Sequence, residues 1–194
     1  MCTARTSLRR GCWGKPLVNK LSPVSDPLSQ LRWLHHFTDS RNVHWIREMG
    51  GLFSRQELKS KEAEFFPGGN EWSLDADEMF GMDGYVHLCF RTNHPMEHKA
   101  KQEGRIERTT WLNIDPSVLR MEGVMYSHGV SNKSGMPICT IRQAIEQIDF
   151  EVICTRTDWR DPEIKARLNH AELCEVLVPK HLPLTYFEQY LPNG

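Results

Sequence analysis

The chain has 194 residues, of which 39% are hydrophobic and 25% are charged, so a disordered segment is excluded and one globular domain fits the length. No apolar run approaches the roughly 20 residues that a membrane-spanning helix needs. The formal net charge of −1 disfavours a protein that coats duplex DNA, so any contact with nucleic acid should be confined to a local groove.

Six Cys residues are spread along the chain without a CxxC pair. This spacing argues against a zinc knuckle or a disulfide scaffold, and reduced thiols in a cytoplasmic protein are the simplest interpretation. We therefore expect neither a disulfide framework nor a Cys-based metal site.

Residues 1–30 are predicted to be an irregular N-terminal arm, because Pro and Gly interrupt any hydrophobic period there. Its Arg and Lys side chains could contact an anionic partner, although a solvated tail is the simpler interpretation. No apolar core follows the Arg residues, so the arm is not predicted to be a secretory signal. Residues 31–194 are expected to form a single domain.

A strand, a polar corner and a helix are predicted within residues 34–54. Aromatic and β-compatible residues favour a strand over 32–37, and apolar residues that recur every third position indicate the helix, which a Gly pair closes. The corner gathers His36, Thr38 and Asn42 beside a helix N-terminus, where a phosphate or a ribose could be held. The alternative for this window alone is a capped helix with a buried His.

Two helices and the clearest strand follow. A charged segment over 55–64 predicts a short exposed helix, and residues 71–79 predict a second helix with an acidic first turn. Residues 85–90 follow Gly84 and predict the strand.

Residues 94–98 contain a His pair that could suggest a metal site, but the surrounding sequence argues against one. His94 and His98 have the spacing of helical metal ligands, but Pro95 lies between them, favouring a loop or a helix start, and no third ligand is evident. We expect no metal, and we expect residues 99–108 to be a charged connector.

Residues 109–114 predict another strand, which Asp115-Pro116 stops. Residues 118–124 should form a short turn or strand. A polar loop over 126–135 follows, and loops of this composition carry ligand contacts more often than packing.

A helix is predicted over 140–148, a strand over 150–154 and a further helical segment over 157–167. Basic side chains surround a Trp in the last segment, which suits single-stranded nucleic acid through phosphate contacts and base stacking. The alternative is a solvated helix with one core Trp.

An apolar strand is predicted over 173–179, and one carboxylate, Glu175, interrupts it. A Glu in a buried strand is costly unless it is paired or functional. Glu172, just before the strand, competes for any catalytic role. Residues 182–190 are expected to close the chain as an edge strand.

Four motifs in this order resemble the DarT family, the ADP-ribosyltransferase toxins that modify bases in DNA. They are His36-Phe37-Thr38 with Asn42 and Gly50-Gly51-Leu52; Tyr85-Val86-x-Leu88-x-Phe90 followed by His94-Pro95-Met96; Val130-Ser131-Asn132-Lys133-Ser134-Gly135; and Glu175-Val176-Leu177-Val178-Pro179. Together the motifs span residues 34–186.

The resemblance implies an α+β, ADP-ribosyltransferase-like fold with a split, mostly antiparallel sheet and flanking helices around an NAD cleft. It implies that Glu175 is the catalytic carboxylate and that His36, supported by Thr38, contacts the ribose in the nicotinamide half of NAD. A carboxylate also suits the chemistry, because it can stabilise an oxocarbenium-like ribose and help to deprotonate the attacking base. The remaining NAD contacts that it implies are Phe37, Asn42, Leu52 and Met96.

The sequence departs from the family where an Arg is usual in the helix before the Tyr85 strand, since residues 71–79 contain none. Either Arg55 or Arg91 covers the NAD phosphates or base, or this branch positions its substrate differently. An aromatic residue is also common where Cys89 stands.

The resemblance therefore predicts an enzyme that transfers ADP-ribose from NAD to a base in single-stranded DNA. It would act in the cytoplasm as a toxin or anti-phage effector, with a macrodomain-type hydrolase or a masking protein as antitoxin, and without a membrane or metal. Alternatives are an acceptor that is RNA, protein or water, or a catalytically inactive nucleic-acid-binding relative. The expected nucleic-acid contacts are Asn132, Lys133, Arg156, Trp159 and Arg160.

Overall fold

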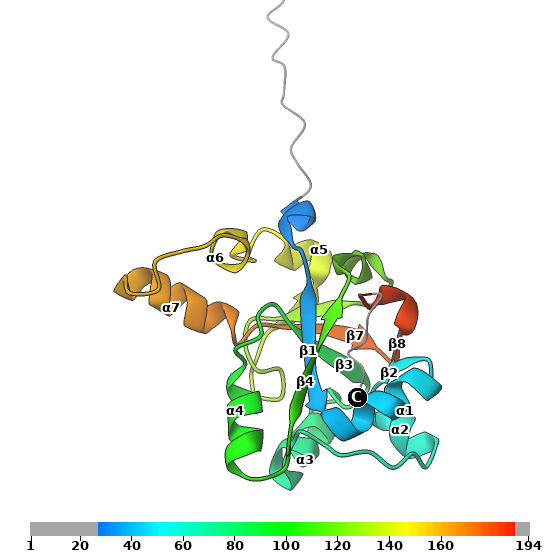
Figure 1. The fold of residues 1–194 in the computed structure, drawn as a ribbon. Coiled ribbons are helices and arrows are strands. Elements are labelled where there is room, and N and C mark those ends of the chain that lie inside the picture. Colours follow the sequence, from blue (N-terminus) through cyan, green and yellow to red (C-terminus); the bar gives the residue numbers. More distant parts are fainter. Residues whose placement is uncertain (1–26, 189–194) are drawn as a thin grey trace, which may run out of the picture.

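One six-stranded antiparallel sheet forms the centre of the computed structural model, which describes residues 27–188 (Figure 1). In spatial order its strands are β4 (Thr109–Ile114), β1 (Leu34–Asp39), β3 (Tyr85–Cys89), β7 (Glu175–Pro179), β5 (Met125–Ser127) and β6 (Ile138–Thr140). A separate two-stranded sheet pairs β2 (Gly51–Phe53) with β8 (His181–Pro183). The mixed fold and the antiparallel sheet agree with the sequence-based prediction.

The sheet is split between β1 and β3. β1 pairs with β4 along its whole length, and β3 pairs with β7 along its whole length, but β1 and β3 share only the pair His35↔Cys89. The two strands therefore diverge beyond this pair, which leaves space between them at one end of the sheet.

Helices flank the sheet and connect its strands (Figure 1). The α-helices are α1 (Val43–Glu48), α2 (Arg55–Ser60), α3 (Glu71–Met79), α4 (Pro95–Gln102), α5 (Ile141–Ala144), α6 (Phe150–Cys154) and α7 (Pro162–Ala171). Short 3-10 helices are η1 (Pro27–Gln30), η2 (Ser40–Asn42), η3 (Pro116–Arg120) and η4 (Leu184–Tyr186). The predicted arm over 1–30 lies outside the described residues except for η1.

The core is formed by the apolar faces of the two central strands. Val86 and Leu88 of β3 and Val176 and Val178 of β7 are buried, as alternation along a strand requires. The opposite face of the same two strands carries Glu175 of β7 and His87 of β3.

The polar corner predicted after β1 exists, but the strand runs two residues further than expected, to Asp39. The Asp39 carboxylate accepts hydrogen bonds from Arg41 N and from Glu107 N, so it ties η2 to the segment before β4. The helix α1 then ends at the predicted Gly pair. Gly51 is required there because a Cβ atom would lie 2.2 Å from the Leu182 carbonyl oxygen of β8.

The strand predicted over 150–154 is wrong, because these residues form helix α6. Their β-branched and aromatic side chains favour a strand locally, but the Asp149 carboxylate caps a helix by accepting from Val152 N. Val152 then packs against Leu168 and Ala171 of α7, which gives the helical turn a buried face. Tertiary packing thus overrides local propensity.

Smaller differences concern element boundaries. Residues 99–102 of the predicted connector belong to α4, whose buried face consists of Glu97 and Ala100 rather than of large apolar residues. The start of the predicted 126–135 loop is strand β5, and α7 begins at Pro162, later than predicted. The predicted edge strand over 182–190 is reduced to β8 and η4 within the described residues.

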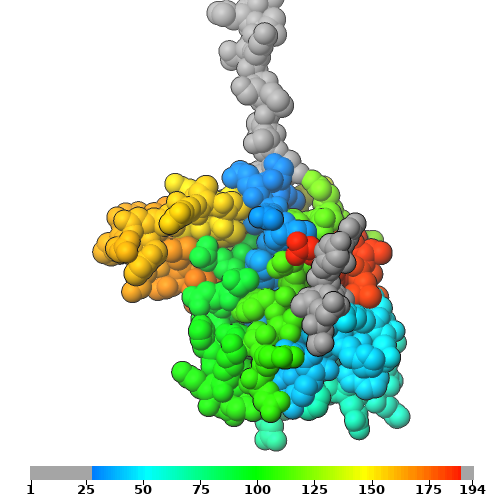
Figure 2. Space-filling view, viewed as in Figure 1, coloured from blue at the N-terminus to red at the C-terminus, as the bar shows by residue number. Residues whose placement is uncertain are grey.

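Helices α6 and α7 project to one side of the sheet, away from α1, α2 and α3 (Figure 1). In the space-filling view they form the yellow-to-orange protrusion (Figure 2). Within residues 27–188, no helix has the length and the apolar character that crossing a membrane requires.

Candidate active site

Glu175 lies at the first position of β7, opposite Cys89 of β3 and next to the split in the sheet. Its side chain is only 8% exposed, and one carboxylate oxygen is held by two donors. Oε2 accepts from the backbone N of Ser131 at 3.1 Å and from Nδ1 of His87 at 3.2 Å. Oε1 lies 4.0 Å from Nε2 of His94, beyond hydrogen-bond distance. This oxygen is therefore the one left free for a ligand.

The charges around Glu175 favour its ionised form. Burial alone would raise the pKa of Glu175, but hydrogen bonds from His87 and Ser131 and the charge of His87 hold it below its usual value. Burial alone would lower the pKa of His87, but the hydrogen bond and charge of Glu175, with the charge of Asp77, raise it to about 9. The Glu175 side chain is buried and the His87 side chain is partly buried, and each favours the charged form of the other.

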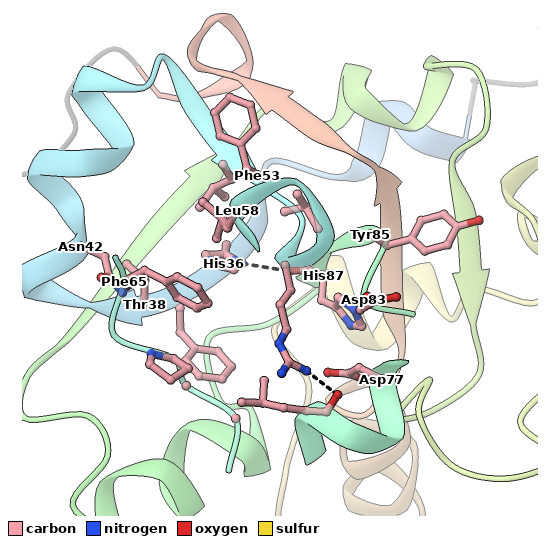
Figure 3. Close-up of a pocket in the computed structure, with 18 of the residues that line it drawn as sticks. His36, Thr38, Asn42, Phe53, Leu58, Phe65, Asp77, Asp83, Tyr85 and His87 are labelled. Carbon is pink, nitrogen blue, oxygen red and sulfur yellow. Dashed lines mark hydrogen bonds between the residues drawn. The ribbon is translucent and has the colours of Figure 1, made fainter. Parts of the chain in front are cut away.

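His36 spans the split between β1 and β3. Its Nδ1 donates to the carbonyl oxygen of His87 at 2.9 Å, so Nε2 is left as a hydrogen-bond acceptor. Burial lowers the pKa of His36 to about 4, which keeps the ring neutral at neutral pH. Figure 3 shows this contact, with Asp77 on the neighbouring helix α3.

A cavity of about 270 Å³ opens above Glu175. One side is polar, and the opposite wall is apolar and comes from α1, α2, β2 and the loop over 61–70 (Figure 3). The apolar wall includes Trp45, Leu52, Phe53, Leu58, Phe65 and Phe66. This combination of apolar walls with a few buried polar groups is typical of a small-molecule site.

Asn42 connects the loop over 61–70, which is part of the apolar wall, to the corner after β1 by hydrogen bonds. Its amide nitrogen donates to Thr38 Oγ1 at 3.0 Å and to the Phe66 carbonyl oxygen at 2.8 Å, and its amide oxygen accepts from Phe66 N at 2.9 Å. The guanidinium of Arg41 lies 3.7 Å above the Phe66 ring. The side chain of Asn42 thus holds the loop in place as well as lining the cavity.

The structure places only one of the two candidate arginines at the cavity. Arg55, from the first turn of α2, lines it and donates to the Leu74 carbonyl oxygen of α3. Arg91 does not line it, and its Nε lies 3.5 Å from the carboxylate of Glu172. Glu172 is the C-cap of α7 and also lies outside the cavity lining, so Glu175 is the better placed of the two carboxylates.

The other predicted NAD contacts, Phe37, Thr38, Leu52 and Met96, all line the cavity. Four residues around Glu175 were not predicted to be site residues: Asp77, His87, His94 and Ser131. His87 had one sequence signal, since it alternates with Val86 and Leu88 and must face away from the core.

The predicted nucleic-acid contacts fall in two separate places. Asn132 is buried at the cavity, where its amide donates to Ser73 Oγ at 3.1 Å, and Lys133 is exposed beside it. Arg156, Trp159 and Arg160 are exposed on the connection between α6 and α7 and do not line the cavity. Trp159 is 59% exposed, which excludes the alternative of a core Trp. Contact of these residues with nucleic acid stays a prediction.

The described residues contain no group of three His, Cys, Asp or Glu side chains arranged to hold a metal ion. His94 is buried at the cavity, whereas His98 is exposed and contacts Asn93 Oδ1 at 3.0 Å. The two side chains therefore have different surroundings.

Comparisons with known proteins relate this fold to one family. The family model that matches, over residues 35–190, is DarT, described as ssDNA thymidine ADP-ribosyltransferase. A search of curated proteins found no match.

Solved structures of this family are similar to the chain. Thermus sp. 2.9 DarT in complex with ADP-ribosylated ssDNA has a TM-score of 0.61 and 18% identity, over 82% of this chain and 80% of that chain. The same Thermus protein in complex with NAD+ has a TM-score of 0.54 and 19% identity, over 81% and 80%. Thermosipho africanus DarTG in complex with ADP-ribose has a TM-score of 0.61 and 16% identity, over 81% of this chain and 43% of that chain. At these identities the similarity establishes the fold.

Proposed function

Because the chain belongs to the DarT family of ssDNA thymidine ADP-ribosyltransferases, we propose that the cavity over Glu175 binds NAD and that Glu175 is its catalytic carboxylate. The enzyme is an NAD-dependent ADP-ribosyltransferase that acts on single-stranded DNA. The observation that supports the assignment of Glu175 is its buried, ionised carboxylate, which keeps one oxygen free beneath the cavity.

The reaction breaks the bond between the ribose C1′ and nicotinamide, which leaves as a neutral molecule, and forms a bond between C1′ and a ring nitrogen of the acceptor base. Positive charge develops on the ribose between these events, and the free Oε1 of Glu175 is placed to stabilise it. The same carboxylate accepts the N–H proton of the attacking base and later releases it to solvent. Thymine in a nucleoside has one N–H group, so we propose that this nitrogen is the acceptor.

Two further residues are proposed to hold NAD. His36 presents the acceptor Nε2 to the cavity, where a ribose hydroxyl can donate to it. Arg55 is the one arginine among the described residues that line the cavity, so we assign the pyrophosphate to it in place of the arginine that α3 lacks.

A toxin role fits the family, and an antitoxin partner is our proposal. One of the similar structures is named DarTG, and the present chain covers 43% of it. We propose that a separate or linked antitoxin, either a macrodomain-type hydrolase or a masking protein, restrains this chain. Because the acceptor is DNA, we propose that it acts in the cytoplasm.

Mass spectrometry of oligonucleotides tests the reaction. The protein and NAD are incubated with a thymidine-containing DNA strand, the same strand with every thymidine replaced, and RNA of the matching sequence. We expect an ADP-ribose adduct only on the first strand. An adduct on RNA alone would support the alternative acceptor, and no adduct on any strand would support an inactive relative.

The Glu175→Gln variant tests the catalytic assignment, and Glu172→Gln is the matched control because that carboxylate lies outside the cavity lining. We expect transfer to fall at least about 100-fold in the first variant and to stay near the wild-type rate in the second. Transfer at the wild-type rate by Glu175→Gln would refute the assignment.

A further inference from the structure

Both ring nitrogens of His87 face hydrogen-bond acceptors. Nδ1 lies 3.2 Å from Oε2 of Glu175, with the Ser131 hydroxyl at 3.4 Å, and Nε2 lies 3.1 Å from the carbonyl oxygen of Met82. A neutral imidazole carries one proton and can donate to only one of these partners. Both contacts are satisfied only when His87 carries two ring protons, that is, when it is an imidazolium cation.

Several titratable and charged side chains surround His87. They are Glu175 on β7, Asp77 on α3 and, as further titratable groups, His36 on β1, His94 at the start of α4 and Arg55 on α2. Two carboxylates therefore flank the His87 ring, whereas burial lowers the pKa of both neighbouring histidines and keeps them neutral. This balance supports a positive charge on His87.

The surroundings of Glu175 make His87 its principal cationic neighbour. His94 accepts a hydrogen bond from Met96 N at Nδ1, so its proton is on Nε2, and this atom is 4.0 Å from Oε1. The guanidinium of Arg55 donates to the Leu74 carbonyl oxygen of α3. Within residues 27–188, His87 is the one group able to carry positive charge whose nitrogen lies within hydrogen-bond distance of Glu175.

We propose that His87 is a positioning residue, an imidazolium cation that fixes the Glu175 carboxylate and keeps it ionised beneath the substrate. His87 does not need to touch the ribose; it acts on the reaction through Glu175. With one oxygen held by His87 and Ser131 N, the carboxylate cannot rotate away, and Oε1 stays directed to the cavity. The proposal rests on the proposed function only in its kinetic consequences, because the charge of His87 can be measured without any substrate.

The first test measures that charge in the wild-type protein. Protein labelled with ¹⁵N in its nine His residues is titrated between pH 6 and 10, and two-bond ¹H–¹⁵N spectra report the protons on each ring. We expect the sequence-assigned His87 ring to keep both protons at pH 8 and to lose one near pH 9. A His87 ring with a single proton at pH 8 would overturn the proposal.

The second test uses His87→Gln, which keeps polarity and loses the charge. We expect kcat for transfer to single-stranded DNA to fall at least about tenfold at pH 7, with less than a twofold change in KM for NAD. We also expect the acidic limb of the kcat profile to move up by about one pH unit or more, because Glu175 loses its cationic neighbour. His98→Gln is the matched control, since that ring is exposed outside the cavity.

An unmoved acidic limb in a folded His87→Gln protein would overturn the positioning role, because a merely structural residue would lower activity equally at all pH values. If His87→Gln does not fold, the titration of the wild-type protein decides whether His87 is a cation and so whether the proposal stands. If the wild-type protein transfers nothing to DNA, the proposed function fails, and the titration still tests the charge on His87 separately.

Discussion

Replacing Asn42 with Ala should destabilise the apolar wall of the cavity and leave β3 and β7, which carry His87 and Glu175 and form the floor of the cavity, unchanged. The change removes three hydrogen bonds, one to Thr38 and two to the backbone of Phe66, each between 2.8 and 3.0 Å. At about 1 kcal/mol for each net hydrogen bond, the free energy of unfolding should fall by roughly 2–4 kcal/mol. For a chain of this length that corresponds to a decrease in Tm of roughly 5–12 °C.

Thermal unfolding and NAD kinetics together test this prediction. The loop over 61–70 carries Phe65 and Phe66 to the cavity, so its release should raise KM for NAD about tenfold. The change in kcat at saturating NAD should be smaller, because Glu175 is held by other elements. Asn93→Ala is the matched control, since Asn93 is exposed and receives one hydrogen bond from His98. A Tm within 1 °C of wild type and an unchanged KM would refute the reasoning.

Three further predictions concern single side chains. His36→Ala should raise KM for NAD about tenfold or more, whereas His98→Ala should not; equal NAD kinetics in both variants would remove His36 from the site. The pKa of His87 is raised from 6.5 to about 9 on folding, so its stabilisation is complete below pH 6.5 and is lost as the pH rises to 9. Denaturant unfolding should show a decrease of up to about 3 kcal/mol across this range, and the decrease should be absent in His87→Gln; a flat wild-type profile would contradict the raised pKa. Trp159→Ala should weaken single-stranded DNA binding at least fivefold by fluorescence anisotropy while Tm changes by less than 1 °C, because Trp159 is 59% exposed. Trp72→Ala, at a 75% exposed position on α3, is its control, and equal affinities would exclude Trp159 from the DNA contact.

The predictable elements of the fold are those in which local signals and packing agree. The Tyr85 strand has alternating apolar residues after a Gly, and helix α3 has Asn70 as an N-cap, whose side chain accepts from Ser73 N. In α6 the signals disagree, because residues with high strand propensity are buried against α7 as a helix. Such packing partners are distant in the chain and cannot be identified from one segment.

The site, like the fold, was predictable only in part. His36 and Glu175 stand in motifs that resemble a known family, and both line the cavity. His87 was not identified, because its role depends on the pairing of β3 with β7, which brings it to the same face as Glu175. The choice between Arg55 and Arg91 also needed the structure, since only the fold separates Arg91 from the cavity and pairs it with Glu172.

The floor and the apolar wall of the cavity differ in how strongly they resist local opening. β7 is an inner strand that pairs with β3 along its whole length and with β5 over Glu175–Leu177, so backbone amides around Glu175 should exchange with solvent only through global unfolding. The wall consists of two six-residue helices, a loop and a two-stranded sheet, and such short elements open at much lower free energies. Substrate entry and product release can therefore proceed by breathing of the wall, while the reactive carboxylate stays aligned through every turnover.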